Sequence, residues 1–224
     1  HREPDRPPLD LGSTPNTTIT KVAYQRLIDY LGLRLDHEPK VIHVPFQLVE
    51  VDEVVLEILH IDTRPVYANP PARFLSDGRF RDEWGIIYRP VKSHGVVLYY
   101  DMVESPLSKA SSVHDIEKHE WPNVEDPRRY EGLREKARKL REKSDYAIVG
   151  HPGSTSLFQT ACGIRGFARF LMDLLKNKDF AHALLQKILE IQGLRMKLYL
   201  SEVGQYLDVV CVGDDFCHQE GPFM

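Results

Sequence analysis

Residues 145–154 read DYAIVGHPGS, and this stretch decides how the rest of the chain is interpreted. An apolar run ends in glycine, histidine and proline, which is typical of a buried strand with a polar loop at its carboxyl end. Residues 207–216, LDVVCVGDDF, have the same arrangement and end in two aspartates. Helical spacing of apolar residues between them predicts one helix over about 156–175 and another from Asp179 to about Glu202, closed by Gly204.

Two further strand candidates precede this region. They are PPLDLGST (7–14) and the apolar part of LEILHIDTRP (56–65), which we expect to end at Asp62. Thr20 is expected to cap a helix that stops at Gly32, a second helix is expected to begin near Pro45, and Asp126-Pro127 should begin a third. Four strands alternating with amphipathic helices predict parallel strands joined by helical crossovers.

Residues 63–125 differ from the rest because they are rich in proline, aspartate and aromatic residues. Within them, DEWGIIYRP (82–90) and VVLYYD (96–101) flank the glycine-containing VKSHG (91–95). Two β-rich runs around such a turn predict a hairpin. The remainder is long enough to be a functional excursion from the main fold.

Composition excludes several classes of protein. With 42% hydrophobic and 28% charged residues in 224, the chain can bury a core, and a formal net charge of -4 gives no electrostatic footprint for nucleic acid. No apolar stretch reaches the ~18–20 residues that span a bilayer, so no membrane contact is expected. Three cysteines without CxxC spacing favour a reducing, cytoplasmic setting. The opening HREPDRPP has neither an initiator Met nor an apolar signal, and looks trimmed.

The four strand candidates leave through polar loops rich in small residues: LDLGST, HIDTRP, IVGHPGS and CVGDDF. In parallel α/β folds, chemistry collects at the carboxyl ends of the strands. We therefore expect Asp10, Asp62, His151 and Asp214 or Asp215 to gather around a single mouth. Gly150 and Gly153 precede a helix, but without GxGxxG or GKS/GKT they make no case for a nucleotide site.

Several segments, taken together and in order, resemble the uroporphyrinogen decarboxylase superfamily, which includes the cobamide-dependent methyltransferases. They are HREPDRPPLDLGST, IDTRP, the DEWG hairpin, WPNVEDPRRYEGLREKA, AIVGHPGS and GDDFCHQEGPF. The resemblance implies a (β/α)8 TIM barrel, an α/β fold, of which this chain holds about the first four units. Residues 1–224 would then be a single partial barrel domain with the excursion at about 63–125, either a fragment or one of two copies that pair to close a barrel.

The resemblance implies a catalytic role for Asp62, because the decarboxylases hold the pyrrole nitrogens of their substrate with an aspartate at the end of the second strand. The alternative is that Asp62 caps a loop or pairs with Arg64, which otherwise could bind an anionic group. The arginine-rich loop of those enzymes is absent from LDLGSTPNTT, and a tyrosine expected near Phe158 is absent too. A polyanionic substrate would lose its bidentate partners.

The remaining candidates for substrate binding come from the strand-end loops. Asp214, Asp215 and Gln219 in GDDFCHQ offer acceptors and an amide to a polar ligand, although one aspartate could instead cap a helix. His151 could donate to a substrate or corrinoid, or be structural. Asp10, in the LDLGST loop, is the remaining candidate for substrate binding.

The leading hypothesis is a corrinoid-dependent methyltransferase that moves a methyl group between a small substrate or thiol and a corrinoid. The resemblance implies zinc as well, with its ligands beyond Met224, because the chain has no His-x-Cys and adjacent Cys217-His218 cannot easily share one ion. We assign no metal ligand to Cys211, His114 or His119. The alternatives are a cofactor-free decarboxylase of uroporphyrinogen or a related tetrapyrrole, and a non-catalytic tetrapyrrole-binding module. Expected partners are the substrate, a corrinoid protein and a second copy in a homodimer.

Overall fold

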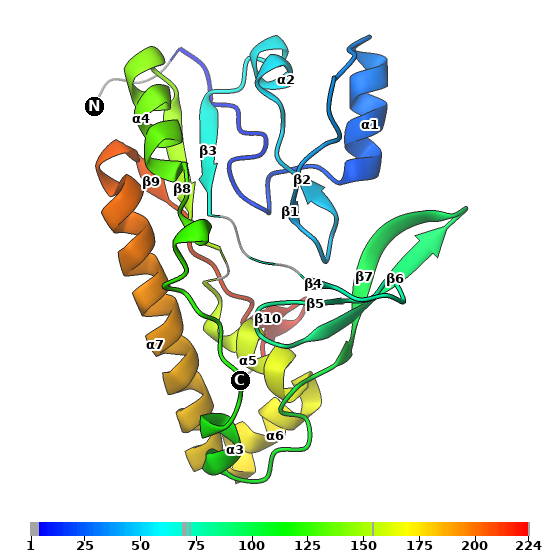
Figure 1. Ribbon diagram of the computed structural model, residues 1–224, viewed down its shortest axis with the longest axis vertical. Helices are drawn as coiled ribbons and strands as arrows, with labels where there is room; N and C mark the ends of the chain where they lie inside the picture. Colours follow the sequence, from blue (N-terminus) through cyan, green and yellow to red (C-terminus); the bar gives the residue numbers. More distant parts are fainter. Residues whose placement is uncertain (1–4, 69–70, 72, 154, 224) are drawn as a thin grey trace.

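The computed structural model describes residues 5–68, 71, 73–153 and 155–223 (Figure 1). His1 to Pro4, Ser154 of the strand-exit loop and Met224 lie outside these residues. The described chain is an α/β protein with several small sheets.

The central sheet is parallel and has the order β3-β8-β9. Its strands are β3 (Thr63–Tyr67), β8 (Ala147–His151) and β9 (Val209–Val210). Tyr67 is the register partner of His151, so the carboxyl ends of β3 and β8 lie side by side. The prediction of parallel strands is confirmed for two of the four candidates, those that contain β8 and β9, whereas β3 begins after Asp62, where another candidate was expected to end.

The predicted TIM barrel is wrong. Among the described residues the parallel sheet has three strands and closes no barrel, and the other sheets, β1-β2, β10-β11 and β4-β5-β6-β7, are antiparallel. The fourth strand candidate, residues 7–14, forms no strand. Its chain turns at Gly12, where φ is +85° and the N–H donates to the Thr17 carbonyl at 3.0 Å. The turn explains why an apolar segment of strand-like composition adds nothing to the sheet.

Two helices, α4 (Leu133–Lys143) and α7 (Lys178–Val203), pack against the central sheet. Val66 and Ile148 from the strands share a buried cluster with Leu133, Ala137, Tyr199 and Val203. The 26-residue α7 runs along the length of the molecule (Figure 1). It is followed by a short 3-10 helix, η2 (Gly204–Tyr206).

The N-terminal part confirms one helix prediction and corrects another. Thr20 caps α1 (Lys21–Tyr30), as predicted. No helix begins at Pro45, because the segment between β1 (Val41–His43) and β2 (Leu48–Val49) is a turn with Gln47 at φ +52°. The next helix, α2 (Glu53–Ile58), uses the apolar residues that were expected to form a strand ending at Asp62, so Asp62 precedes β3.

The predicted hairpin is confirmed by the antiparallel pair β6 (Ile87–Ser93) and β7 (Val96–Glu104). His94 and Gly95 turn the chain with positive φ. With β4 (Arg73–Phe74) and β5 (Phe80–Arg81) it forms an arm that projects from the body of the molecule (Figure 1). After α3 (Val113–Glu117), Asp126-Pro127 begins only a 3-10 turn, η1 (Pro127–Arg129), before α4.

The helix predicted over 156–175 is two helices, α5 (Leu157–Arg165) and α6 (Phe167–Lys176), because Gly166 between them has φ +91°. They pack with α7 and the base of the arm around the largest buried cluster. A small hairpin, β10 (Cys217–His218) and β11 (Gly221–Pro222), ends the described chain. Within the described residues no helix is both long and apolar enough to cross a bilayer.

Candidate functional site

Tyr67 and His151 stand together where β3 and β8 end. Their rings are 5.7 Å apart between centroids. The Tyr67 hydroxyl donates to the Gly12 carbonyl at 2.7 Å, so the glycine turn that ends the first loop is held against the same strand end. Burial raises the pKa of Tyr67, and the phenol therefore stays protonated.

The position of its proton makes His151 a donor. The Gly153 N–H donates to His151 Nδ1 at 3.3 Å. Burial, reinforced by nearby His43, lowers the pKa of His151 to about 4, so the ring is neutral at physiological pH. A neutral imidazole that accepts at Nδ1 carries its hydrogen on Nε2.

His43, at the end of β1, repeats this arrangement. The Phe46 N–H donates to His43 Nδ1 at 3.3 Å, and the two rings stack at 5.2 Å. Burial lowers the pKa of His43 to about 4 as well. Its Nε2 therefore also carries the hydrogen, and among the hydrogen bonds of the described residues neither Nε2–H donates to another side chain, although the His43 ring also interacts with its own backbone.

We call Gly12, His43, Tyr67 and His151 the histidine mouth. It offers two neutral N–H donors in a largely desolvated setting. Such donors stabilise negative charge that develops on a substrate atom, and a neutral imidazole does so without first taking up a proton.

Asp10 and Asp62 were both predicted at the mouth. Asp10 accepts from the Ser13 and Thr63 hydroxyls at 2.6 Å each, and because Thr63 begins β3, the second contact lies at the other end of the strand from Tyr67. Asp62 lies at the opposite end of β3 from Tyr67, because β3 begins after it. It is held there by a bidentate pair with Arg6 at 2.7 Å and by the Leu9 N–H, and these contacts lower its pKa.

Arg64 points to the other face of β3 from Tyr67, as an odd separation along a strand requires. Its buried guanidinium pairs with Glu53 at 2.7 Å and donates to the Ile61 carbonyl at 2.7 Å. It also lies 3.5 Å from the centroid of the Tyr146 ring. The structure does not bring Arg64 to the mouth.

Asp214 accepts from the Phe158 and Gln159 N–H groups at 2.6 and 3.0 Å, which places it at the start of α5. Asp215 and Gln219 are exposed nearby. Of the predicted residues, His151 lines the mouth and Asp10 lies beside its first loop. The roles in substrate binding and catalysis assigned to the whole set stay predictions.

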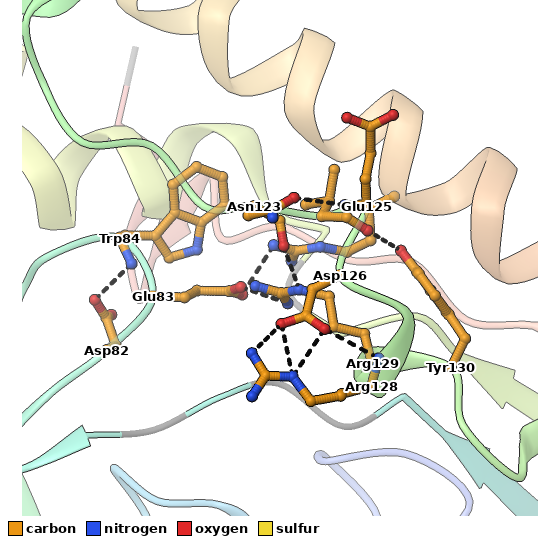
Figure 2. Close-up of polar contacts among 11 residues, drawn as sticks. Asp82, Glu83, Trp84, Asn123, Glu125, Asp126, Arg128, Arg129 and Tyr130 are labelled. Atoms are coloured by element: carbon orange, nitrogen blue, oxygen red, sulfur yellow. Dashed lines mark hydrogen bonds and ion pairs between the residues drawn. The ribbon is translucent and has the colours of Figure 1, made fainter.

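A buried ionic network lies behind the β8 loop. Glu83 pairs with Arg129 at 2.7 Å (Figure 2). It also pairs with Arg195 at 2.8 Å, and the three side chains are at most 7% exposed. Arg129 also donates to the Asn123 carbonyl at 2.7 Å. The network joins the β5–β6 turn, the segment before α4, and α7.

Sequence reasoning missed His43, Tyr67 and the network. Tyr67 would have followed from placing the strand at TRPVY instead of before Asp62. His43 ends a short apolar run, VIH, which is a weak strand signal. Nothing local marks Glu83 and Arg195 as partners, since 112 positions separate them.

A zinc ion does not fit the residues that the structure describes. In that part of the chain, no group of three or more His, Cys, Asp or Glu side chains is placed to hold a metal. Neutral His43 and His151 use Nδ1 as acceptors, and their Nε2 atoms carry hydrogens. Zinc therefore stays a prediction, and the described residues of the mouth act as hydrogen-bond donors instead of metal ligands.

Comparison with known proteins gives one similar structure to report. No family model matches the sequence, and no curated protein matches it. A solved structure described as a methyltransferase from Methanosarcina mazei is 16% identical, with a TM-score of 0.48. The match covers 95% of this chain and 55% of that one, so this chain spans about half the length of that methyltransferase.

Proposed function

We infer that this protein is a methyltransferase that acts at the histidine mouth, with a corrinoid as the other reactant. The observation that carries the proposal is the pair of neutral imidazoles, His43 and His151, each with Nδ1 occupied and Nε2–H available. The choice of methyl carrier is supported by the sequence resemblance to the uroporphyrinogen decarboxylase superfamily, together with the absence of the decarboxylases' arginine-rich loop from LDLGSTPNTT.

The residues of the mouth would assist removal of a methyl group from a heteroatom. The bond between the methyl carbon and that heteroatom would break with its bonding pair staying on the heteroatom, and a low-valent corrinoid, when bound, would supply the electron pair that accepts the methyl group. His43 and His151 donate hydrogen bonds to that atom as its negative charge grows. Because the donors are already oriented by the Phe46 and Gly153 N–H groups, little reorganisation is needed.

The charge of the mouth favours this reaction over decarboxylation of a polycarboxylated tetrapyrrole. His43 and His151 are uncharged at neutral pH. Arg64 is engaged by Glu53, and Arg195 by Glu83. Carboxylate recognition depends on cationic, bidentate partners, and the described mouth supplies neutral donors instead.

The test is methyl transfer by the purified full-length protein from methylated oxygen, sulfur and nitrogen compounds to cob(I)alamin, followed by loss of the cob(I)alamin absorption. His151→Phe keeps a ring but removes the donor, and should lower kcat/KM by about 10²–10³-fold. His151→Gln keeps an N–H and should retain part of the activity. The same comparison applies to His43.

The pH profile is a second readout. With both histidine pKa values at about 4, the wild-type rate should show no histidine titration between about pH 5.5 and 8. Full activity of His151→Phe and His43→Phe would overturn the proposed role of the mouth. Coproporphyrinogen formation that is lost in Asp62→Asn would select the decarboxylase, and corrinoid binding without turnover would select a binding module.

A further inference from the structure

The buried network behind the β8 loop has a direct contact with that loop. A Cβ placed on Gly153 would lie 3.5 Å from the Arg195 Nη1 and 3.8 Å from its Cδ, so the glycine backbone rests against the arginine side chain. Gly153 has φ +101°, a conformation that other residues adopt only with strain. The N–H of this same residue donates to His151 Nδ1.

Arg195 is itself held on two sides. Its Nη2 donates to Glu83 at 2.8 Å, and its guanidinium lies 5.5 Å from the centroid of the Trp84 ring. Glu83 is fixed in turn by Arg129, and Trp84 is 4% exposed (Figure 2). Ion pairs buried to this extent give little net stability relative to apolar packing, but they define geometry.

Two arginines share one glutamate, which makes the network unequal in its response to mutation. Removing either arginine leaves a balanced ion pair, whereas removing Glu83 leaves two buried cations close together. Arg195 contacts Gly153, while Arg129 reaches the Asn123 carbonyl on a different segment. The two arginines therefore have the same charge and burial but different neighbours.

We propose that Arg195 is a positioning residue for the mouth: braced by Glu83, it holds the Gly153 turn so that the Gly153 N–H keeps His151 in the Nε2–H tautomer. The inference rests on the proposed function only in that this tautomer is the one that can donate to the leaving heteroatom. The tautomer itself is measurable without substrate.

The experiment compares Arg195→Met with Arg129→Met in the full-length protein. The 15N chemical shifts of His151 are recorded by NMR, with assignment from a His151→Gln sample. In the wild type, Nδ1 should resonate as an unprotonated nitrogen and Nε2 as a protonated one at pH 7. Arg195→Met should move both shifts toward a mixture of tautomers, and Arg129→Met should leave them unchanged.

Activity provides a second readout. Arg195→Met should lower kcat about tenfold or more with little change in KM, since misplacement of a catalytic group acts on the transition state. Arg195→Lys keeps the charge, so its kcat should lie between those of the wild type and Arg195→Met. It serves as the test variant if Arg195→Met does not fold. Unchanged His151 shifts in folded Arg195→Met or Arg195→Lys, or equal shifts in Arg129→Met, would overturn the positioning role. If the His151 shifts respond to the variants as predicted but the protein transfers no methyl group, only the proposed function is overturned.

Discussion

Asp82 is a carboxylate in an unfavourable environment at the base of the arm. It accepts from the Trp84 and Ile86 N–H groups at 2.9 Å each and from the Tyr88 hydroxyl at 3.2 Å. Burial nevertheless outweighs these donors and raises its pKa to about 6. Near neutral pH the folded protein therefore holds a charge that the apolar surroundings disfavour.

The pH dependence that follows has a definite sign. In the unfolded chain Asp82 loses its proton near the ordinary aspartate pKa of 3.8, whereas in the folded chain it keeps the proton to about pH 6. The folded state binds more protons in this window, so its contribution to stability is greatest below pH 4 and falls as the pH rises to 6, by roughly 2–3 kcal/mol in total.

Asp82→Asn should abolish that loss. The amide keeps an oxygen for the two N–H groups but carries no charge, so the variant should unfold at higher temperature than the wild type at pH 7. Thermal melts of both proteins from pH 4 to 7.5 check this. The proposal fails if Asp82→Asn is less stable than the wild type at pH 7, or if the melting temperature of both proteins changes with pH in the same way. Either result would show that the hydrogen bonds to Asp82 outweigh its burial and that its pKa is not raised.

At the residue scale, sequence reasoning succeeded where a local pattern fixes position. His151 ends an apolar run before proline and glycine, and it lies at the strand end as expected. The position of His43 could not be predicted, because it depends on the β1–β2 turn, where a helix was expected. The tautomers of His43 and His151 could not be predicted from the sequence either. They are set by the Phe46 and Gly153 N–H groups, whose positions depend on local backbone geometry.

Among the secondary-structure elements, α5 depends on a residue distant in sequence. Its own N-cap, Ser156, makes no side-chain capping bond, and Asp214 supplies the acceptor for the first two helical N–H groups beyond Leu157. A carboxylate at this place also interacts favourably with the helix dipole. The C-terminal segment is thereby fastened to α5.

Asp214→Ala should destabilise the protein by about 1–2 kcal/mol, because the N–H groups of Phe158, Gln159 and Asp215 lose their acceptor. Asp215→Ala is the matched control, since its exposed side chain makes no such contact in the described chain. Denaturant unfolding of the two variants gives the comparison. Equal stability of both, together with lost activity in Asp214→Ala alone, would instead assign Asp214 to the substrate.

Prediction of the elements depended on whether signals were local. Thr20 and the spacing after it located α1 because capping is set by a few neighbouring residues. The run EVVLEI is apolar and short, and such runs do not distinguish a strand from a buried helix. A helical pattern continues through Gly166, and only its positive φ shows that α5 and α6 are separate.

At the scale of the whole molecule, the arm meets the helical part of the molecule at Gly163 of α5. A Cβ built on Gly163 would lie 2.7 Å from Ile86 Cδ1. A Cβ built on Gly193 of α7 would have no neighbour within 4 Å in the described chain. Both glycines are helical, so alanine should affect them in opposite directions.

Gly163→Ala should destabilise the protein by about 1–3 kcal/mol because Ile86 must move. Gly193→Ala should stabilise it by about 1 kcal/mol through helix propensity alone. Calorimetry of the two variants tests the packing of the arm against α5. If both substitutions were stabilising, the arm would not be fixed in the position described.

The overall architecture was the hardest level to predict. Alternation of strands and helices correctly indicated that β8 and β9 pair in parallel, but it placed their neighbouring strand before Asp62, whereas β3 begins after that residue. It could not show that residues 7–14 turn at Gly12, or that the excursion builds a separate antiparallel sheet. These outcomes depend on contacts between distant segments, about which periodicity carries no information.

Arg195 and Tyr199 lie four positions apart on α7 and so share one face of it. Arg195 binds Glu83 of the arm, and Tyr199 donates to the Val66 carbonyl of β3 at 2.5 Å. Inserting or deleting a single residue between them would turn one of the two side chains about 100° away from its partner. The distance between the arm and β3 is therefore tied to the length of this one helical turn.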